Sequence, residues 1–403
     1  MRLSLCMIVR DEAEMLPAFL EAVGGLWDEL VAVDTGSVDG TADLLSAAGA
    51  KVLERPWDDD FAAARNYGLE RASGDFVLVL DADERVGPLL SSEIRGAVED
   101  RRCGAASLLV EDTLPHGHLR CSRLLRMFRN DPGIRYRHAI HEEVGEAVAL
   151  YLSRSGLARL DLVHPLAHLG YARERATRKN KRERDVRILR SVLAQKPRDL
   201  YARYKLLEQA RFWSDLALWK EAASETAAVL SKEPPDALAC AHFGGELAVL
   251  VAEGLYREEP AAALGYLESF AGRLAPSAEY ELRRGELREK LGDLPGARGA
   301  YEACLGMPRT DNAQFAAVRP RLGLARLALA AGELARAADE GGRALELAPL
   351  DPEALLLLAV LRRHEAGRVG LARFAEERRA ACGDRPEIAK AVREAARLAG
   401  DLA

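Results

Sequence analysis

The chain lacks several features that define common classes of protein. No apolar run approaches the roughly 20 residues that a membrane-spanning helix needs. The six cysteines include no Cys-x-x-Cys pair, so neither a zinc site nor a disulfide scaffold is predicted. The net charge of −6 gives no support to general nucleic-acid binding. What remains, 403 residues with 49% hydrophobic and 30% charged side chains, predicts a soluble globular protein of two or more domains.

The first residues do not show the pattern expected of a secretion signal. Met1–Val9 combines a basic residue with an apolar stretch, but the charged Arg10-Asp11-Glu12 follows directly, without a small-residue cleavage site. This pattern predicts a first strand rather than a signal peptide. We therefore expect a cytoplasmic protein with no nucleic-acid partner and no transmembrane segment.

Residues 1–172 alternate short apolar runs with helical patterns. Strands are predicted at Leu3–Val9, Leu30–Val33, Lys51–Leu53 and Phe76–Leu80, and helices at Glu12–Gly25, Thr41–Ala48 and Phe61–Ala72. This alternation predicts βαβ units and an α/β domain with a mainly parallel, Rossmann-like sheet. Residues 105–170 are less regular, with strand candidates only at Ala105–Val110 and Leu124–Phe128.

A basic segment follows this domain. Residues 173–185 are rich in Arg and Lys, and we predict a basic helical linker over residues 173–200. The ordinary explanation for such a charge run is a solvated helix face with internal ion pairs. The alternative is a contact with an anionic acceptor or a lipid headgroup.

From about residue 186 strand signals vanish, and Ala, Leu, Arg and Glu dominate. Similar short segments surround Gly292, Gly332 and Gly367, at intervals of 40 and 35 residues, and Pro349 and Pro352 mark a turn between two units. The period resembles that of tetratricopeptide repeats, although their Trp and Tyr signature positions are mostly missing. We predict an all-α helical-repeat solenoid over residues 201–403 whose concave side binds a partner. The alternative is a purely structural or dimerising role.

Carboxylates follow three of the predicted strands. Asp81 and Asp83 come directly after the apolar run Phe76–Leu80, Asp34 ends the second strand, and Asp11 with Glu12 follows the first. In open α/β sheets the ligand crevice lies beyond the carboxyl ends of the strands. An Asp-x-Asp pair there offers hard oxygen ligands to a divalent cation that also binds phosphate. The alternative for Asp81 and Asp83 is a turn with a helix cap and solvated acids.

Arg65 lies at the start of a predicted helix, in Ala64-Arg65-Asn66. Its planar fork of N–H donors could reach a diphosphate or the edge of a nucleotide base. The alternative is an ion pair with the acidic cluster at residues 58–60.

Four motifs in order resemble one known family. They are Leu5–Glu12, Val33–Thr41, Phe61–Asn66 and Leu80–Glu84, and together they look like the family-2 glycosyltransferases of the GT-A fold. The resemblance is close over roughly the first 90 residues and looser to about residue 170. The form that is followed by helical repeats resembles a bacterial subgroup that glycosylates peptides, proteins or surface glycans.

This resemblance implies a nucleotide-sugar donor, usually a uridine diphosphate sugar, and a Mn2+ or Mg2+ ion that neutralises the departing diphosphate. By position, Asp34 would contact the uracil, Arg65 the base or diphosphate, and Asp81 the ribose or the metal. Asp83 would ligate the metal directly. Asp11 and Glu12 would also bind the donor, although Asp11 stands where the family commonly has Asn.

Family-2 enzymes invert the anomeric centre in one displacement, which needs one general base on the acceptor. Glu142, in His138-Ala-Ile-His141-Glu142-Glu143, is the predicted base, with Glu143 and His141 as alternatives. An ion pair of this acid with Arg135 or Arg137 would be the structural alternative.

A late histidine often completes the metal site of GT-A enzymes. His168, in His-x-Gly-Tyr, is the predicted further ligand, and the alternative is a structural histidine. Arg123, Arg126 and Arg129, at a spacing of three, could face the donor diphosphate or lie on the surface.

Together these patterns predict a metal-dependent inverting glycosyltransferase whose repeats recognise a peptide, protein or glycan acceptor, with a homodimer as a further expectation. The first alternative is a helical-repeat scaffold that carries an inactive transferase domain. A sugar-nucleotide-forming nucleotidyltransferase would need a Gly-rich phosphate loop and a basic residue after the first strand. Arg10-Asp11-Glu12 stands there instead, which argues against that class.

Overall fold

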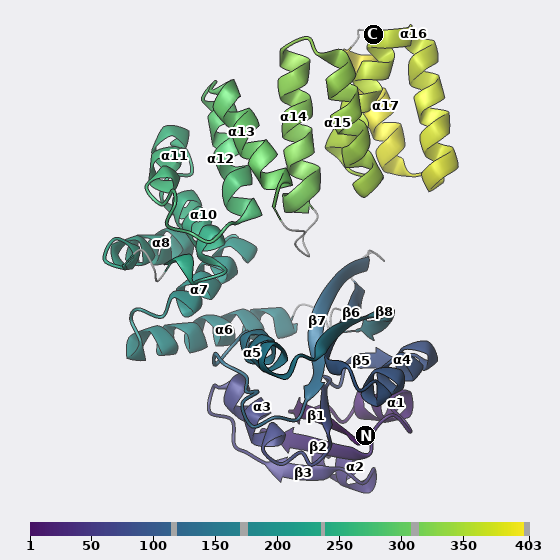
Figure 1. Cartoon of the computed structure of the whole chain (residues 1–403), viewed down its shortest axis with the longest axis vertical. Coiled ribbons are helices and arrows are strands. Elements are labelled where there is room, and N and C mark those ends of the chain that lie inside the picture. Colours follow the sequence, from purple (N-terminus) through teal and green to yellow (C-terminus); the bar gives the residue numbers. More distant parts are fainter. Residues whose placement is uncertain (114–118, 170–175, 235–237, 308–313, 399–403) are drawn as a thin grey trace. The chain divides into compact units, whose positions relative to one another are not determined.

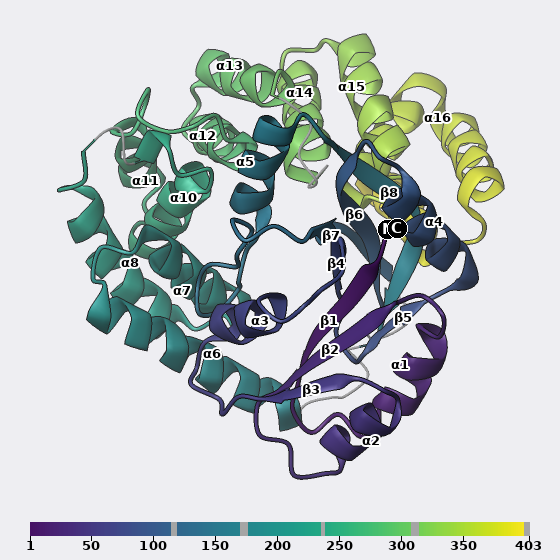
Figure 2. The same cartoon turned by 60° about the horizontal axis from the view of Figure 1, so that its bottom comes forward.

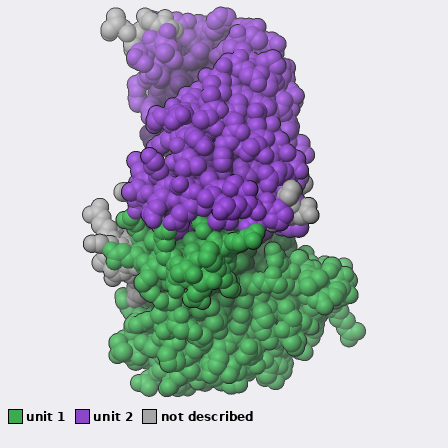
Figure 3. All heavy atoms as spheres, turned by 90° about the vertical axis from the view of Figure 1, so that its left-hand side faces the viewer, with its two compact units in different colours: residues 1–205 green, residues 206–403 purple. Residues whose placement is uncertain are grey.

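The structure is a computed structural model, and it describes residues 1–113, 119–169, 176–234, 238–307 and 314–398. The chain divides into two compact units, residues 1–205 and residues 206–403 (Figure 3). Helix α6 (Ala176–Gln195), in the segment predicted as a linker, belongs to the first unit. Among the helices that the structure describes, none combines the length and the apolar composition of a membrane span.

The first unit is built on one mixed sheet whose strand order is β3-β2-β1-β4-β7-β6-β8-β5. The strands are β1 (Leu3–Val9), β2 (Glu29–Asp34), β3 (Lys51–Glu54), β4 (Phe76–Val79), β5 (Glu84–Val86), β6 (Cys103–Thr113), β7 (Leu119–Arg129) and β8 (Ala158–His168). The neighbours β3, β2, β1 and β4 pair in parallel, and so do β6 and β8. The pairs β4–β7, β7–β6 and β8–β5 are antiparallel. The α/β class is therefore confirmed, and the parallel block is the part with the strongest apolar runs.

Helices cover both faces of the sheet. They are α1 (Leu16–Ala22), α2 (Thr41–Ala47), α3 (Phe61–Leu69), α4 (Pro88–Glu99) and α5 (Gly145–Ser155). Because successive side chains of a strand point to opposite faces, Leu3, Leu5 and Met7 of β1 pack in the core with α1, α2 and α4. Cys6 packs on the other face with α3 and α5. Figure 2 shows α3 on one side of the parallel strands and α1 and α2 on the other.

The second unit is helical, and its described residues contain no strand. Its helices are α7 (Leu200–Phe212), which begins in the first unit, α8 (Leu216–Leu230), α10 (Gly244–Leu255), α11 (Pro260–Glu268), α12 (Ala278–Lys290), α13 (Leu294–Leu305), α14 (Arg319–Ala330), α15 (Leu334–Leu347), α16 (Pro352–Cys382) and α17 (Pro386–Leu398). A short π-helical segment, Gln314–Val318, precedes α14. Figure 1 shows α12 to α17 as a row of antiparallel helices, which confirms the predicted repeat architecture.

All three repeat glycines have a positive φ, and two of them occupy equivalent turns. Gly292 between α12 and α13 has φ +83°, and Gly332 between α14 and α15 has φ +75°. In each of these two turns the amide three residues after the helix end donates to a carbonyl five residues earlier, from Asp293 to Arg288 at 2.9 Å and from Glu333 to Ala328 at 2.8 Å. Gly367, with φ +60°, lies at the kink inside α16. The sequence similarity thus reflects a positive φ that glycine adopts at little cost.

The packing between α13 and α14 depends on the absence of a side chain at Gly323. The Tyr301 ring is fully buried, and a Cβ on Gly323 would lie 2.4 Å from it. We expect Gly323→Ala to lower the free energy of unfolding by about 1–3 kcal/mol, because an overpacked core must shift its side chains or backbone. Urea denaturation of the full chain measures this. In the control variant Gly299→Ala, a Cβ would meet no atom within 4 Å, so we expect a gain of about 0.5–1 kcal/mol. Equal stability of the two variants would contradict this account of the packing.

Candidate functional site

The loops after β1 and β2 bind each other and fix the first group of predicted residues. The amide of Asp11 donates to Ser37 Oγ at 3.0 Å, and the amide of Val38 donates to Asp11 Oδ1 at 2.8 Å. Buried Asp34 uses Oδ1 to accept from the amides of Gly36 and Ser37 at 2.9 and 2.8 Å. These contacts explain the tight Gly-containing loop and hold Asp34 in a fixed orientation.

Glu12 is tied to the same pair of loops. Its amide donates to Thr41 Oγ1 at 2.8 Å, and Thr41 begins α2. The structure therefore brings Asp11, Glu12 and Asp34 together at the carboxyl ends of β1 and β2. Their contacts with a donor stay a prediction.

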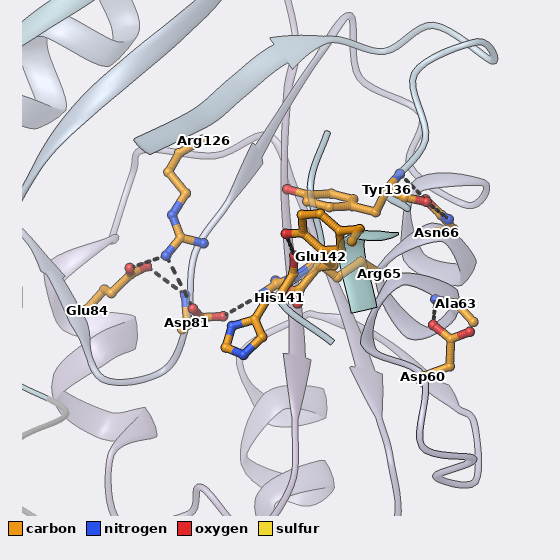
Figure 4. Close-up of polar contacts among 11 residues, drawn as sticks. Asp60, Ala63, Arg65, Asn66, Asp81, Glu84, Arg126, Tyr136, His141 and Glu142 are labelled. Atoms are coloured by element: carbon orange, nitrogen blue, oxygen red, sulfur yellow. Dashed lines mark hydrogen bonds and ion pairs between the residues drawn. The ribbon is translucent and has the colours of Figure 1, made fainter. Parts of the chain in front are cut away.

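Arg65 joins two acids from separate parts of the chain. Its Nε donates to Glu142 Oε1 at 2.6 Å, and its Nη2 donates to Asp81 Oδ1 at 3.2 Å (Figure 4). Arg65 comes from α3, whose first turn is capped by Asp60 through the amide of Ala63 at 2.8 Å. Only 9% of the Arg65 side chain is exposed, against 15% for Glu142 and 34% for Asp81. The predicted alternative, in which Arg65 pairs with the acids at residues 58–60, is not among its contacts in the described residues.

A second arginine holds Asp81 from the opposite side. Arg126 of β7 donates from Nη2 to Glu84 Oε1 at 2.6 Å and to Asp81 Oδ2 at 3.4 Å. Glu84 is almost fully buried, and its Oε2 accepts the amide of Asp81 at 2.8 Å. Asp81 is thus fixed by its own amide and by both carboxylate oxygens, as Figure 4 shows.

Burial and ion pairing act in opposite directions on these groups. Burial would raise the pKa of Asp81, but Arg65 and Arg126 outweigh it and hold that pKa below its usual range. Burial raises the pKa of Glu84 to about 7, and Arg126 offsets only part of this effect. Asp81 is therefore a carboxylate at neutral pH, while Glu84 binds a proton more readily than an exposed glutamate does.

A pocket of about 400 Å³ opens beside these groups. Its lining comes from β7, the end of β4, α3 and residues 136–145, and consists of Arg65, Asp81, Leu124, Leu125, Arg126, Tyr136, Glu142, Glu143, Val144 and Gly145. Arg65 Nη1 and Arg126 Nε are buried and have no hydrogen-bond partner among the described residues. An oxygen-rich ligand could accept these hydrogens. Asp34, Asp83 and His168 do not line this pocket, so the predicted donor residues do not all surround one hollow.

Asp83 and His168 meet at a neighbouring position. Strand β5 pairs with β8 so that Glu84 lies opposite His168, and His168 Nε2 is 3.4 Å from Asp83 Oδ2. A carboxylate oxygen suits Mn2+, and an imidazole nitrogen binds it less readily. The described residues contain no group of three or more side chains with metal-ligand geometry. Two protein ligands fit a cation that takes its other oxygens from a diphosphate and water.

The loop that carries the predicted base has contacts that the sequence did not indicate. Arg137 pairs with Glu146 at 2.9 Å, and Arg135 donates to the carbonyl of Ile134 at 2.8 Å. The described partner of Glu142 is Arg65 instead, so the structural alternative for Glu142 involved the wrong arginines. The two other candidates for the base, His141 and Glu143, both contact the hydroxyl of Tyr201, at 2.7 Å through the His141 carbonyl and at 2.8 Å through Glu143 Oε1.

Three further residues of the site were missed or left open. The Asn66 amide exchanges two hydrogen bonds with the backbone of Tyr136, at 2.9 and 2.8 Å, and the Tyr136 ring lies 5.7 Å from the Arg65 guanidinium. Asn66 follows Arg65 in the motif, which is the one signal that could have shown this support. Of the three arginines spaced at intervals of three, Arg126 reaches the pocket. The other two donate to backbone carbonyls, Arg123 to Leu162 and Arg129 to Cys103.

Comparison with known proteins agrees with this division of the chain. Residues 4–109 match the family model described as glycosyl transferase family 2. A TPR repeat-containing protein of Synechococcus elongatus is 34% identical over 313 residues, which are 76% of this chain and 66% of that protein. The SPbeta prophage-derived glycosyltransferase SunS of Bacillus subtilis is 27% identical over 147 residues, 34% of this chain and 33% of that protein.

An uncharacterized glycosyltransferase of Rickettsia felis is 29% identical over 93 residues, 23% of this chain and 32% of that protein. The chain thus spans just under two thirds of the first of these relatives and about a third of the other two. The similarity to the named glycosyltransferases is short and covers at most 147 residues, whereas the similarity to the repeat protein extends over 313.

Proposed function

We propose that this chain, whose residues 4–109 carry a glycosyl transferase family 2 domain, transfers a sugar from a nucleotide diphosphate sugar to an acceptor. A uridine diphosphate sugar is the first candidate donor, and a peptide, protein or glycan bound in part by the helical repeats is the candidate acceptor. One observation supports this best: a single buried guanidinium, that of Arg65, holds both Asp81 from the strand end and Glu142 from the pocket loop. Asp81, which we propose binds the donor, and Glu142, the proposed base, therefore line the same pocket.

Glu142 would act as the general base of an inverting displacement. Its Oε1 is held by Arg65, whereas Oε2 accepts no hydrogen bond from the residues that the structure describes. In one step the acceptor oxygen bonds to the anomeric carbon, the bond from that carbon to the diphosphate breaks, and the acceptor proton passes to Oε2. The freed electron pair leaves on the nucleoside diphosphate.

The remaining residues would hold the donor. Asp83 and His168 would bind a divalent cation, which when present neutralises charge on the departing diphosphate. The unpartnered N–H groups of Arg65 and Arg126 would donate to oxygens of a ligand in the pocket. Asp34, fixed by the loop amides, would accept from the base or ribose.

A thermal-shift series with UDP, GDP and ADP, each with and without Mn2+, tests this function. A ligand that binds only the folded state at 100 times its Kd adds about 2.7 kcal/mol of stability, so the preferred nucleotide should stand out. If no nucleotide raises the melting temperature at any Mn2+ concentration, the alternative of a repeat scaffold with an inactive transferase domain gains support.

Matched histidine variants test the proposed metal ligands. We expect His168→Ala to weaken Mn2+-dependent nucleotide binding at least about 10-fold, because one of two protein ligands is lost. His164→Ala on the same strand is the control, since His164 faces Glu93 at 3.1 Å rather than Asp83. Isothermal titration with Mn2+ and the preferred nucleotide measures both. Equal affinities of the two variants would remove His168 from the metal site.

A further inference from the structure

The loop that carries Glu142 contains two residues whose backbone conformation is unfavourable unless other contacts stabilise it. His138 and His141 have φ values of +71° and +54°, in the left-handed region that residues other than glycine rarely adopt. Such conformations persist where surrounding contacts determine them, and they gather at functional sites. The contacts around residues 138–143 therefore decide where Glu142 lies.

Ile140 is buried, but other residues of the loop border two cavities, so close packing does not surround the loop on every side. Glu142 and Glu143 line the pocket of about 400 Å³ described above. His138, Ala139 and Ile140 line a second cavity, of about 610 Å³, on the side of α6 and α7. Hydrogen bonds and ring contacts must therefore stabilise the parts of the loop that are not closely packed.

The base of the loop is tied to the domain by backbone bonds. Arg137 and Glu143 exchange two hydrogen bonds, at 2.9 and 3.1 Å, and so close the loop at its neck. The amide of Phe61, at the start of α3, donates to the carbonyl of Ala139 at 2.8 Å. These bonds fix the two ends and one intermediate residue.

Tyr201 holds the remainder of the loop. Its buried ring stacks on the His138 ring with centroids 3.7 Å apart, and its hydroxyl lies 2.7 Å from the His141 carbonyl and 2.8 Å from Glu143 Oε1. Burial lowers the pKa of His138, so this ring is neutral at neutral pH and stacks without a charge. One side chain thus contacts both residues with positive φ and the acid next to Glu142.

We propose that Tyr201 is a positioning residue for the transfer reaction, because it fixes the backbone of His141 and thereby the orientation of Glu142 in the pocket. The inference rests on the proposed function and extends it to a residue of α7, which lies far outside the matched residues 4–109. Tyr201 itself does not line the pocket that Glu142 lines. It therefore acts on the reaction through the loop.

The test compares two tyrosines that make the same kind of bond. Tyr201→Phe keeps the stacked ring and removes the hydroxyl. Tyr280→Phe is the control, because the buried Tyr280 hydroxyl also bonds to a backbone carbonyl, that of Leu267 at 2.7 Å, but in the second unit. Both variants are assayed as full chains for UDP release from UDP-glucose and UDP-N-acetylglucosamine with Mn2+.

We expect Tyr201→Phe to lower kcat about 10- to 100-fold, since a displacement of about 1 Å costs up to that much. Its donor KM should change less than about threefold, because the hydroxyl touches no donor residue, and the control should keep both constants. Amide exchange over residues 138–143 should accelerate in Tyr201→Phe alone. A kcat equal to that of wild type, or the same loss in both variants, overturns the inference.

The outcomes separate this inference from the proposed function. Turnover by wild type with an unaffected Tyr201→Phe variant overturns the positioning role and leaves the transferase function intact. A wild type that releases no UDP from either donor counts against the function that we propose for these donors. Amide exchange then decides by itself whether Tyr201 holds the loop.

Discussion

Arg65→Met should lower the free energy of unfolding by about 3 kcal/mol. Removing one partner of a buried ion pair leaves the other charge without compensation, which costs about 3–5 kcal/mol. The variant leaves Glu142, with 15% of its side chain exposed, without its described partner, and it leaves Asp81 with Arg126 alone. We expect the lower end of the range because a third of the Asp81 side chain reaches solvent. Turnover should be lost as well, since the variant frees both the acid on the donor side and the proposed base.

Urea denaturation of the full chain measures the effect, and Arg95→Met provides the control. Arg95 also pairs with an acid, Asp28, at 3.1 Å, but the side chains are 32% and 37% exposed. Exposed ion pairs contribute up to about 1 kcal/mol, so the control should lose no more than that. Similar losses in both variants would show that the Arg65 network contributes no more than a surface pair.

The pH dependence of this effect has a definite sign. Because the folded-state pKa of Asp81 lies below its usual value of about 3.9, its ion pairs stabilise the fold above that pH. The contribution disappears as the pH falls from about 4 towards the folded-state pKa. The difference in stability between wild type and Arg65→Met should therefore be greatest near pH 7 and shrink below pH 4. A constant difference between pH 7 and pH 3 would contradict the proposed network.

The parallel half of the fold could be predicted because its strands are buried on both faces. Continuous apolar runs such as that at Phe76–Val79 are typical of strands that are buried on both faces of a parallel sheet. Strand β8 was missed for the opposite reason. It contains Pro165, which cannot donate a ladder hydrogen bond, and its register with β6 shifts between Ser107 and Leu109. An irregular strand of this kind shows no clear alternation of apolar and polar side chains, so it could not be predicted from the sequence.

The functional site also has residues that the sequence predicted and residues that it did not. Asp81 and Asp83 follow a predicted strand and Arg65 opens a predicted helix, so chain order alone placed them near the carboxyl edge of the sheet. Arg126 and Tyr201 were not assigned because their positions depend on pairing at a distance. Arg126 arrives on β7, antiparallel to β4, and the register of that pair cannot be read from local composition. Tyr201 lies about 60 residues beyond the loop that it contacts.

Replacing the proposed base should have the greatest effect on rate. Glu142→Gln keeps the side chain's shape and an oxygen that can accept from Arg65 Nε, but an amide cannot take up the acceptor proton. We expect kcat to fall about 10²- to 10⁴-fold while the affinity for the donor nucleotide stays within about threefold. Glu146→Gln is the control, because Glu146 is four residues away, exposed and paired with Arg137 at 2.9 Å.

Glu143→Gln and the pH profile decide among the acids of the loop. In wild type the rate should fall at acidic pH because the base becomes protonated. The residual activity of Glu142→Gln should not show this acidic decrease. Glu143→Gln keeps an acceptor for the Tyr201 hydroxyl. This variant should still lose rate at acidic pH, and its loss of kcat should be smaller than that of Glu142→Gln. If Glu143→Gln instead shows the greater loss and the flat profile, Glu143 is the base. The Arg65–Glu142 pair would then serve to orient Asp81, because the guanidinium that holds one carboxylate also holds the other.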